Sequence, residues 1–193
     1  MTFTRGEMAA LVGWTDNQAQ NAIRKGRVPT AAWAVTGSPG QFEDDPEPED
    51  AAIAYGNGPT RRTWARFDFE QVVAIAAANA ATGAFAGCGE NARLPSLIAG
   101  VLRGTPGMLE IAERPPSDLF LAIAEMDHEA VREKYPDNPD PVAIYTADFA
   151  NAAHWIADRR REFGIVRAEL IDLSRLINDI HARADATGLE FPD

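Results

Sequence analysis

Residues 3–29 carry the polar and apolar spacing of two short helices joined by a tight turn. Thr4 with Glu7 fits a capping box, in which two residues satisfy each other's backbone amides at a helix start. Thr15 with Gln18 repeats that spacing at the start of the second helix. The apolar residues that follow the two boxes recur at helical spacing: Met8, Ala9, Leu11, Val12, Ala19, Ala22 and Ile23.

Glycine and proline mark the ends of these two helices. Gly13 can take the left-handed conformation that redirects the chain between them. Gly26 stands where a left-handed residue closes a helix, and Pro29 prevents its continuation. Ala9 is small where the second helix would cross the first, and Ile23 would fill the wedge between them. The segment therefore predicts a helix-turn-helix.

The following segment predicts a loop, a short strand and a third helix. Residues 37–60 are rich in glycine, proline and acidic side chains, which is typical of a solvated loop. Residues 61–67 alternate enough to form a short strand. Asp68 with Gln71 fits a third capping box, and apolar residues follow it at helical spacing.

The middle of the chain has the weakest pattern. Residues 83–93 have the composition of a linker, and residues 94–113 favour a helix that Gly104 interrupts. Residues 127–135 favour another helix. Two apolar runs could be strands, and the first could equally be helical: 119–123 and 142–146.

Residues 148–185 have apolar side chains at alternating steps of four and three, the heptad spacing of a coiled coil. Only Arg159 interrupts this seam, and Gly164 would cost the helix about 1 kcal/mol. We expect a long helix that pairs with a second copy, although the same stripe could be the core of a single-chain helical domain. The expected dimer contacts are Ile156, Phe163, Val166, Leu170, Leu173, Ile177 and Ile180.

Charge is distributed unevenly along the chain. The 193 residues carry a net charge of −11, which argues against indiscriminate nucleic-acid binding. Residues 1–80 hold seven basic and ten acidic side chains, and six of these acids lie in the tract 43–50. Residues 81–193 hold 11 basic and 19 acidic side chains. Outside the tract, a mildly basic N-terminal part therefore precedes an acidic remainder.

Composition also bears on the compartment. The hydrophobic fraction of 46% is enough for a packed core, yet no apolar run reaches membrane-spanning length without a break. Cys88, the one cysteine, can form neither an internal disulfide nor a zinc ligand set, and it is either a redox sensor or a linker thiol. The N-terminus lacks the apolar core of a signal peptide. We therefore expect a cytoplasmic protein that does not bind membranes.

The second predicted helix carries side chains that can read DNA. Gln and Asn can pair bidentately with adenine, and Arg24 can reach guanine or a phosphate. Thr15 and the helix N-terminus can bind a backbone phosphate. The alternative is an ordinary helical hairpin with a polar outer face. The expected DNA contacts of this segment are Thr15, Asn17, Gln18, Gln20, Asn21, Arg24, Lys25 and Arg27.

The order of features over residues 3–80 resembles the winged helix-turn-helix of the MerR and excisionase-like families. In those families the second helix ends in glycine, a small apolar residue and proline follow, and a wing strand then leads into another helix. Here the corresponding residues are Gly26, Val28, Pro29, Arg66 and Phe67, with the next helix from Asp68. The resemblance implies groove contacts from residues 16–25. It also implies phosphate contacts from the wing arginines Arg61, Arg62 and Arg66.

Two features depart from that family pattern. Recognition helices of MerR proteins usually carry Arg-Tyr-Tyr or a similar run, where this chain has Gln20, Asn21 and Ala22. The wing is also interrupted by about thirty residues that include the acidic tract 43–50. This tract would weaken non-specific DNA binding or fold back over the basic face, and the alternative is a plain surface insertion.

The expected fold class is mainly α, in three parts. Residues 1–82 would form a winged helix-turn-helix with a short wing strand and the acidic loop insertion 37–60. Residues 83–93 would be a linker. Residues 94–193 would form a dimerisation domain that could also sense an effector. That domain would have a mixed helical middle with room for two short strands, followed by the long coiled-coil-like helix.

Residue spacing gives no catalytic or metal-binding constellation. His128 stands beside Asp127 and Glu129, but sequence neighbours point apart on a helix. His154 and Asp158 have the spacing of a surface hydrogen bond. We expect no enzyme activity, no metal and no cofactor. The apolar middle of the chain could hold a ligand pocket or only core, so a small-molecule effector stays undetermined.

The sequence thus predicts a homodimeric, sequence-specific regulator of transcription, bacterial or prophage-type, that binds double-stranded DNA. Residues 16–25 would read the groove, the wing would anchor phosphates and residues 148–185 would form the dimer. Two other classes stay open. One is a DNA-packaging protein similar to the small subunit of phage terminases, and the other is a protein-interaction module that does not bind DNA.

Overall fold

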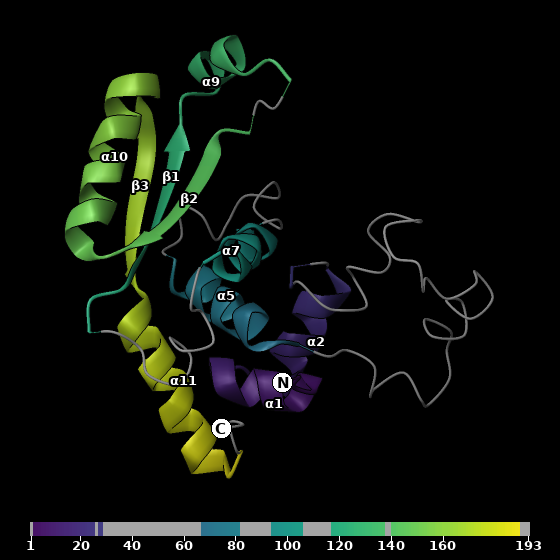
Figure 1. Cartoon of the computed structure of the whole chain (residues 1–193). Coiled ribbons are helices and arrows are strands. Elements are labelled where there is room, and N and C mark those ends of the chain that lie inside the picture. The colour runs from purple at the N-terminus through teal and green to yellow at the C-terminus, as the bar shows by residue number, and fades with distance from the viewer. Residues whose placement is uncertain are drawn as a thin grey trace.

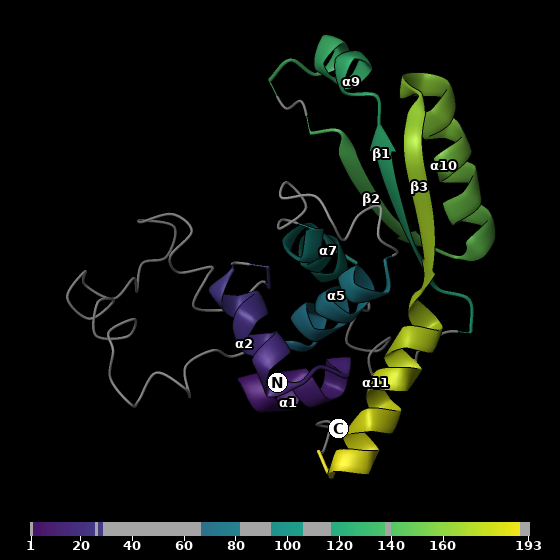
Figure 2. The same ribbon diagram turned by 180° about the vertical axis from the view of Figure 1, so that it is seen from behind.

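The structure, a computed structural model, describes residues 2–25, 27–28, 67–81, 94–105, 117–137 and 140–189. Within these ranges the chain forms seven helices and one three-stranded antiparallel sheet (Figure 1). The N-terminal helices gather at one end of the sheet, and the C-terminal helix runs back from the sheet to join them (Figure 2).

Four helices pack together and are called the head here: α1 (Arg5–Val12), α2 (Asp16–Arg24), α5 (Phe69–Ala80) and α7 (Leu94–Arg103). The three predicted capping boxes are confirmed at the starts of α1, α2 and α5. Phe3 and Phe67 exchange backbone hydrogen bonds of 2.7 and 2.9 Å, which join the segments that lead into α1 and α5. These two hydrogen bonds therefore hold the start of α1 beside the start of α5.

The sheet has the strand order β2-β1-β3, so the first strand lies in the centre. β1 (Phe120–Met126) pairs antiparallel with β2 (Val142–Ala147) on one side and with β3 (Ile165–Asp172) on the other. A short helix, α9 (His128–Lys134), stands between β1 and β2 in the chain.

Local patterns predicted part of this region. The choice left open at 119–123 is resolved as a strand, β1, while the possible strand at 142–146 is observed as β2 and the helix expected within 127–135 is confirmed as α9. The first part of the interrupted helix expected over 94–113 is confirmed as α7, which ends at Arg103 before Gly104, and residues 106–113 lie outside the described residues. The linker 83–93 lies outside the described residues.

One face of the sheet is covered by α10 (Phe149–Phe163), as Figure 1 shows. Ala122 and Ala124 of β1 and Ala152 of α10 are completely buried, and their small side chains let the helix lie close to the strand. On the β2 side, Tyr145 stacks on Trp155 with 5.6 Å between ring centroids. The opposite face of β1 adds Leu121 and Ile123 to the core of the head.

After β3 the chain enters α11 (Leu173–Thr187), which packs against α1 and α5. Leu173, Ile177, Ile180 and Ala184 are completely buried and belong to the same apolar core as the head. That core draws on residues from both sides of the predicted linker, so burial of α11 stabilises the head and the sheet together.

The expected long C-terminal helix is wrong, and with it the expected fold class. Residues 148–185 are split into α10, β3 and the greater part of α11. Gly164 ends α10 with a φ of 70°, and Asp172 caps α11 by accepting the Arg175 amide at 2.8 Å. Gly164 and Asp172 are therefore local stop and start signals that divide the segment despite its heptad spacing. The spacing is a coincidence, since an alternating strand between two helices can preserve steps of three and four.

The seven residues expected to form the coiled-coil seam therefore have different surroundings. Leu173, Ile177 and Ile180 are buried in the core of their own chain, and Phe163 is buried against Met126 and Val131. Ile156 is half-buried on α10. The two remaining members lie on β3 and are exposed: Val166 and Leu170.

Candidate nucleic-acid interface

The turn between α1 and α2 has the geometry that the sequence predicts for a helix-turn-helix. Gly13 adopts the left-handed conformation with φ of 74° and ψ of 29°. The backbone amide of Trp14 donates to the oxygen of Ala9 at 2.8 Å and closes α1. Ala9 is buried and Ile23 packs against the apolar core of the head. The two helices pack against each other across this turn.

The outer side of α2 is polar and exposed. Ala19 is completely buried and Ala22 is half-buried, which fixes the inner side of the helix. The predicted groove-reading side chains of the helix are all exposed: Asn17, Gln18, Gln20, Asn21 and Arg24. At 3.6 residues per turn, Asn17, Gln20, Asn21 and Arg24 follow one another along a single side. The sequence-predicted set thus forms one continuous surface.

The N-terminus of α2 is closed by its own side chains. The Thr15 hydroxyl accepts from the Gln18 amide at 3.3 Å, and the Gln18 Oε1 accepts from the Thr15 amide at 2.8 Å. The Thr15 hydroxyl also donates to that oxygen at 3.0 Å. The amide and the hydroxyl of Thr15 are therefore both engaged in the cap, which leaves them less suited to hold a phosphate than the sequence predicts.

An ion pair that spacing did not reveal joins the two helices. Arg5 donates through Nε and Nη2 to the two carboxylate oxygens of Asp16, each at 2.9 Å. This bidentate geometry is the strongest form of a carboxylate–guanidinium contact. It neutralises the one acid of α2 and fixes the first turn of α2 against the first turn of α1. The two residues are eleven apart in sequence, a separation that no helical spacing rule covers.

The C-terminal end of α2 is basic. Arg24, Lys25 and Arg27 are exposed there, and Arg24 donates to the Asn21 side-chain oxygen at 3.4 Å. The Arg27 amide donates to the Ala22 oxygen at 2.9 Å, the bond that closes a helix in a Schellman motif. Cations at a helix C-terminus interact favourably with the helix dipole. With Asp16 paired, the exposed side of α2 is positive at one end and neutral along the rest.

The wing is described only at its last residue. Phe67 forms an isolated antiparallel bridge with Phe3, just before α5. Arg61, Arg62 and Arg66 lie outside the described residues, as do the acidic tract 43–50 and Gly26. Their expected contacts stay predictions.

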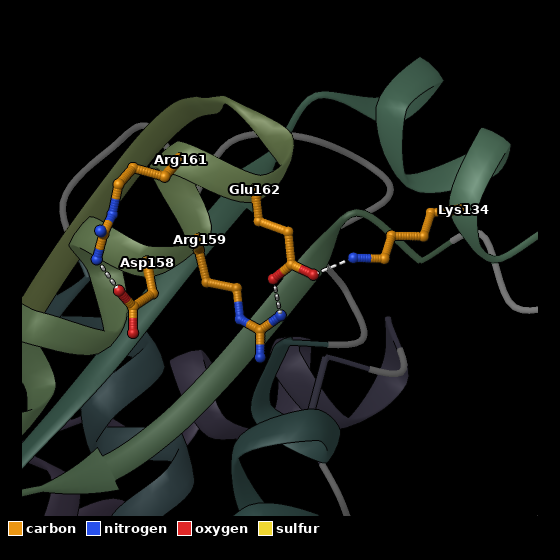
Figure 3. Close-up of polar contacts among 5 residues, drawn as sticks. All are labelled: Lys134, Asp158, Arg159, Arg161 and Glu162. Carbon is orange, nitrogen blue, oxygen red and sulfur yellow. Dashed lines mark hydrogen bonds and ion pairs between the residues drawn. The ribbon is translucent and has the colours of Figure 1, made fainter.

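A second polar cluster lies far from the head, between α9 and α10 (Figure 3). Glu162 binds Lys134 and also accepts from Arg159 Nη1 at 3.1 Å. The hydrogen bond from Lys134 to Glu162 raises the pKa of Lys134 above its ordinary value. Arg161 pairs with Asp158 on the outside of the same helix.

The guanidinium of Arg159 borders a small hollow. Its Cζ lies 5.6 Å from the Trp155 ring centroid and 5.7 Å from that of Phe163, and its Nε is buried without a hydrogen-bond partner. The hollow has a volume of about 240 Å³ and is lined by Met126, Val131, Tyr135, Asp140, Val142, Ala143, Arg159 and Phe163. The Nε–H of Arg159 could donate to an acceptor group in this hollow. The residues that line the hollow include no cysteine and no histidine.

Two of the three histidines are exposed, and the third, His181, is half-buried with its ring centroid 6.4 Å from that of Phe69. His128 is the first residue of α9 and is exposed, while the neighbouring Asp127 caps that helix. His154 Nε2 lies 3.4 Å from Asp158, the surface contact that the sequence spacing predicted. Among the described residues, no three His, Cys, Asp or Glu side chains gather closely enough to hold a metal ion.

Comparisons of the chain with known protein families, curated proteins and solved structures gave no match. In the part of the chain that the structure describes, no helix has the length and apolar character needed to cross a bilayer. The assignment of a function to this protein therefore depends on the geometry of the head.

Proposed function

We propose that this protein is a cytoplasmic, sequence-specific DNA-binding protein that regulates transcription as a homodimer. One observation carries the proposal: α2 presents Asn17, Gln20, Asn21 and Arg24 on one exposed side, on a helix held by α1 through a left-handed glycine turn. A polar helix side of this kind fits the major groove of B-DNA, which is wide enough to admit one α-helix.

The side chains of α2 supply two kinds of contact. Gln20 and Asn21 each carry an amide that can donate to and accept from adenine in the major groove. Arg24 can donate bidentately to guanine, and its bond to Asn21 holds the two side chains side by side. Lys25 and Arg27 continue the positive surface toward the phosphates. Together they combine base reading with backbone anchoring.

The Arg5–Asp16 pair supports this role by removing a repulsive charge. Asp16 lies at the start of α2, where an unpaired carboxylate would face the phosphates across the groove. The guanidinium of Arg5 holds that carboxylate bidentately at 2.9 Å. Asp16 therefore acts as a positioning residue for α2, and Arg5 cancels its charge. The expected wing residues Arg61, Arg62 and Arg66 would add phosphate contacts from the resemblance to winged helix-turn-helix proteins.

A DNA-packaging protein similar to the small subunit of phage terminases was the first alternative, and it was suggested by a coiled coil after the head. α10, β3 and α11 occupy that segment instead, so this feature no longer supports it. A protein-interaction module without DNA binding remains the alternative that the experiment must distinguish.

Selection from a random double-stranded DNA library tests the proposal directly. The purified chain is incubated with the library at moderate salt, and bound duplexes are amplified and sequenced over several rounds. We expect enrichment of one motif, weaker binding at higher salt, and loss of enrichment for Arg24→Ala. Arg66→Ala should lower affinity for the motif without removing its sequence preference. Enrichment of no motif by the folded protein would contradict the proposal.

A further inference from the structure

β3 forms an edge of the sheet with its outer backbone groups facing away from β1. Among the described residues it pairs with β1 alone. Eight residues make this a long edge for a small sheet. Such an edge is a template for a further strand unless a chain covers it, because its N–H and C=O groups alternate between the partner and the outside.

The side chains of β3 on the α10 side are apolar and exposed. Leu170 is 36% exposed and Val166 is 62% exposed. Leu170 stands opposite Ala122, and Tyr145 stands opposite Ala122 from the other strand, so all three share the face that α10 covers. The stacking of Tyr145 on Trp155 draws α10 toward the β2 side. The β3 side of that face therefore keeps an uncovered apolar strip.

The sequence of β3 is complementary to itself when the strand is reversed about Ala168. An antiparallel copy centred there places Arg167 opposite Glu169, and Glu169 opposite Arg167. The same register places Val166 opposite Leu170. Each pair joins either opposite charges or two apolar side chains, the combinations that stabilise neighbouring strands.

We propose that a second copy of this chain pairs with the β3 edge, antiparallel and centred on Ala168, to form one continuous sheet across the dimer. Backbone hydrogen bonds join the two strands, while the Arg167 and Glu169 pairs select the register. Val166 and Leu170, both exposed, stand at the two ends of the paired stretch 167–169. The register shift between Glu125 and Met126 leaves Val166 of β3 as the extra residue of a bulge, so the regular ladder is limited to the part of β3 from Arg167 onward and is centred on Ala168.

This dimer would place both heads on the same side of the joined sheet. A two-fold axis perpendicular to the sheet keeps its faces distinct, and each head lies on the face opposite α10. The strands run in opposite directions, so α11 leaves each copy at the opposite end. At about 3.3 Å per residue, the two Leu173 residues stand about 33 Å apart.

The proposed interface does not depend on DNA binding, so its test contains no DNA. Light scattering coupled to size exclusion gives the mass of the full chain over a range of concentrations. We expect a dimer for the native sequence. Arg167→Glu and Glu169→Arg should each raise the dimer dissociation constant at least about tenfold, because each places like charges opposite one another twice.

Mixing the Arg167→Glu variant with the Glu169→Arg variant provides the decisive measurement. A chain with Glu at both positions and a chain with Arg at both positions satisfy every pair across the interface, so the mixture should recover the dimer. Arg132→Glu on α9 is the matched control, since Arg132 is exposed on a helix that contributes no residue to the proposed interface, and it should leave the mass unchanged. Circular dichroism checks that each variant is folded.

Leu170→Lys keeps the test valid if Arg167→Glu fails to fold, because Arg167 also binds Glu125 of its own chain at 2.6 Å. Leu170 is partly exposed, and its replacement should weaken the dimer without unfolding the chain. A monomeric native protein at all concentrations would overturn the proposal. So would dimers of undiminished stability in Glu169→Arg and Leu170→Lys, or a mixture of the charge variants that stays monomeric.

Discussion

The Nη1 atom of Arg183 donates a hydrogen bond to the backbone oxygen of Leu11 at 3.0 Å. The two residues are 172 positions apart in the chain. The Arg183 guanidinium also lies 3.4 Å from the point that a Cβ on Gly13 would occupy. The C-terminal helix thus holds the turn that orients α2, and the candidate DNA-reading surface depends on a contact with the far end of the chain.

Arg183→Ala should destabilise the protein by about 1 kcal/mol, because the Leu11 carbonyl loses a charged donor beside the turn. Urea unfolding followed by circular dichroism measures the change. Arg175→Ala on an exposed position of the same helix is the control and should be nearly neutral. Equal stability of the two variants would show that the Arg183 contact does not hold the turn.

Gly13→Ala should cost about 1 to 2 kcal/mol, because alanine is strained at the positive φ that this turn requires. The added Cβ would also touch the Arg183 guanidinium. Gly6→Ala is the matched control: Gly6 lies in α1, and its replacement meets no atom within 4 Å. Gly6→Ala should therefore not lower the thermal midpoint. A harmless Gly13→Ala would contradict the observed turn geometry.

Ser174→Ala should destabilise the junction between the sheet and α11. The buried Ser174 hydroxyl accepts from the Leu119 amide at 2.8 Å, and alanine leaves that amide without this acceptor. The expected cost is about 2 kcal/mol. Ser117→Ala, at an exposed position nearby, should leave the urea midpoint unchanged. Faster exchange of the Leu119 amide proton in Ser174→Ala would locate the effect.

The contribution of Asp148 to the stability of the fold should depend on pH. Hydrogen bonds from the backbone and side chain of Asn151 lower the pKa of Asp148 below its ordinary value. A lowered folded-state pKa stabilises the fold above the unfolded pKa, and this gain is lost as pH falls through the folded value. The stability advantage of the native protein over Asp148→Asn should therefore be present at neutral pH and shrink below about pH 4. A pH-independent difference would argue against the shift.

The parts of the fold that sequence predicted are those encoded by neighbouring residues. The capping boxes at Thr4, Thr15 and Asp68 are local exchanges between residues three apart, and each one starts a helix where expected. Gly13 likewise needs only its own conformation to turn the chain. Local signals of this kind do not depend on the remainder of the fold.

The C-terminal region shows where such reasoning fails. The spacing from Ile156 through Val166 to Leu173 fits a heptad, yet Gly164 and Asp172 divide it into helix, strand and helix. The strand forms because β1 offers a partner, and the paired residues lie 39 to 52 positions apart in the sequence. Periodicity alone contains no information about this pairing.

The candidate DNA-reading surface was likewise only partly predictable from the sequence. The exposed side of α2 follows from helical periodicity, and the predicted groove-reading residues do lie there. The Arg5–Asp16 pair and the Arg183–Leu11 bond depend on how helices cross, so no spacing rule finds them. Thr15 illustrates the reverse error, because the same hydroxyl that suits a phosphate is used by its own capping box.

The central claim is that the outer side of α2 reads DNA, and the affinity of α2 variants for the selected duplex tests it most directly. Fluorescence anisotropy with that duplex should show losses of at least about tenfold for Gln20→Ala and for Arg24→Ala, whose side chains are exposed on α2. Arg132→Ala on α9 should bind like the native protein. Native affinity in folded Gln20→Ala and Arg24→Ala would contradict the account.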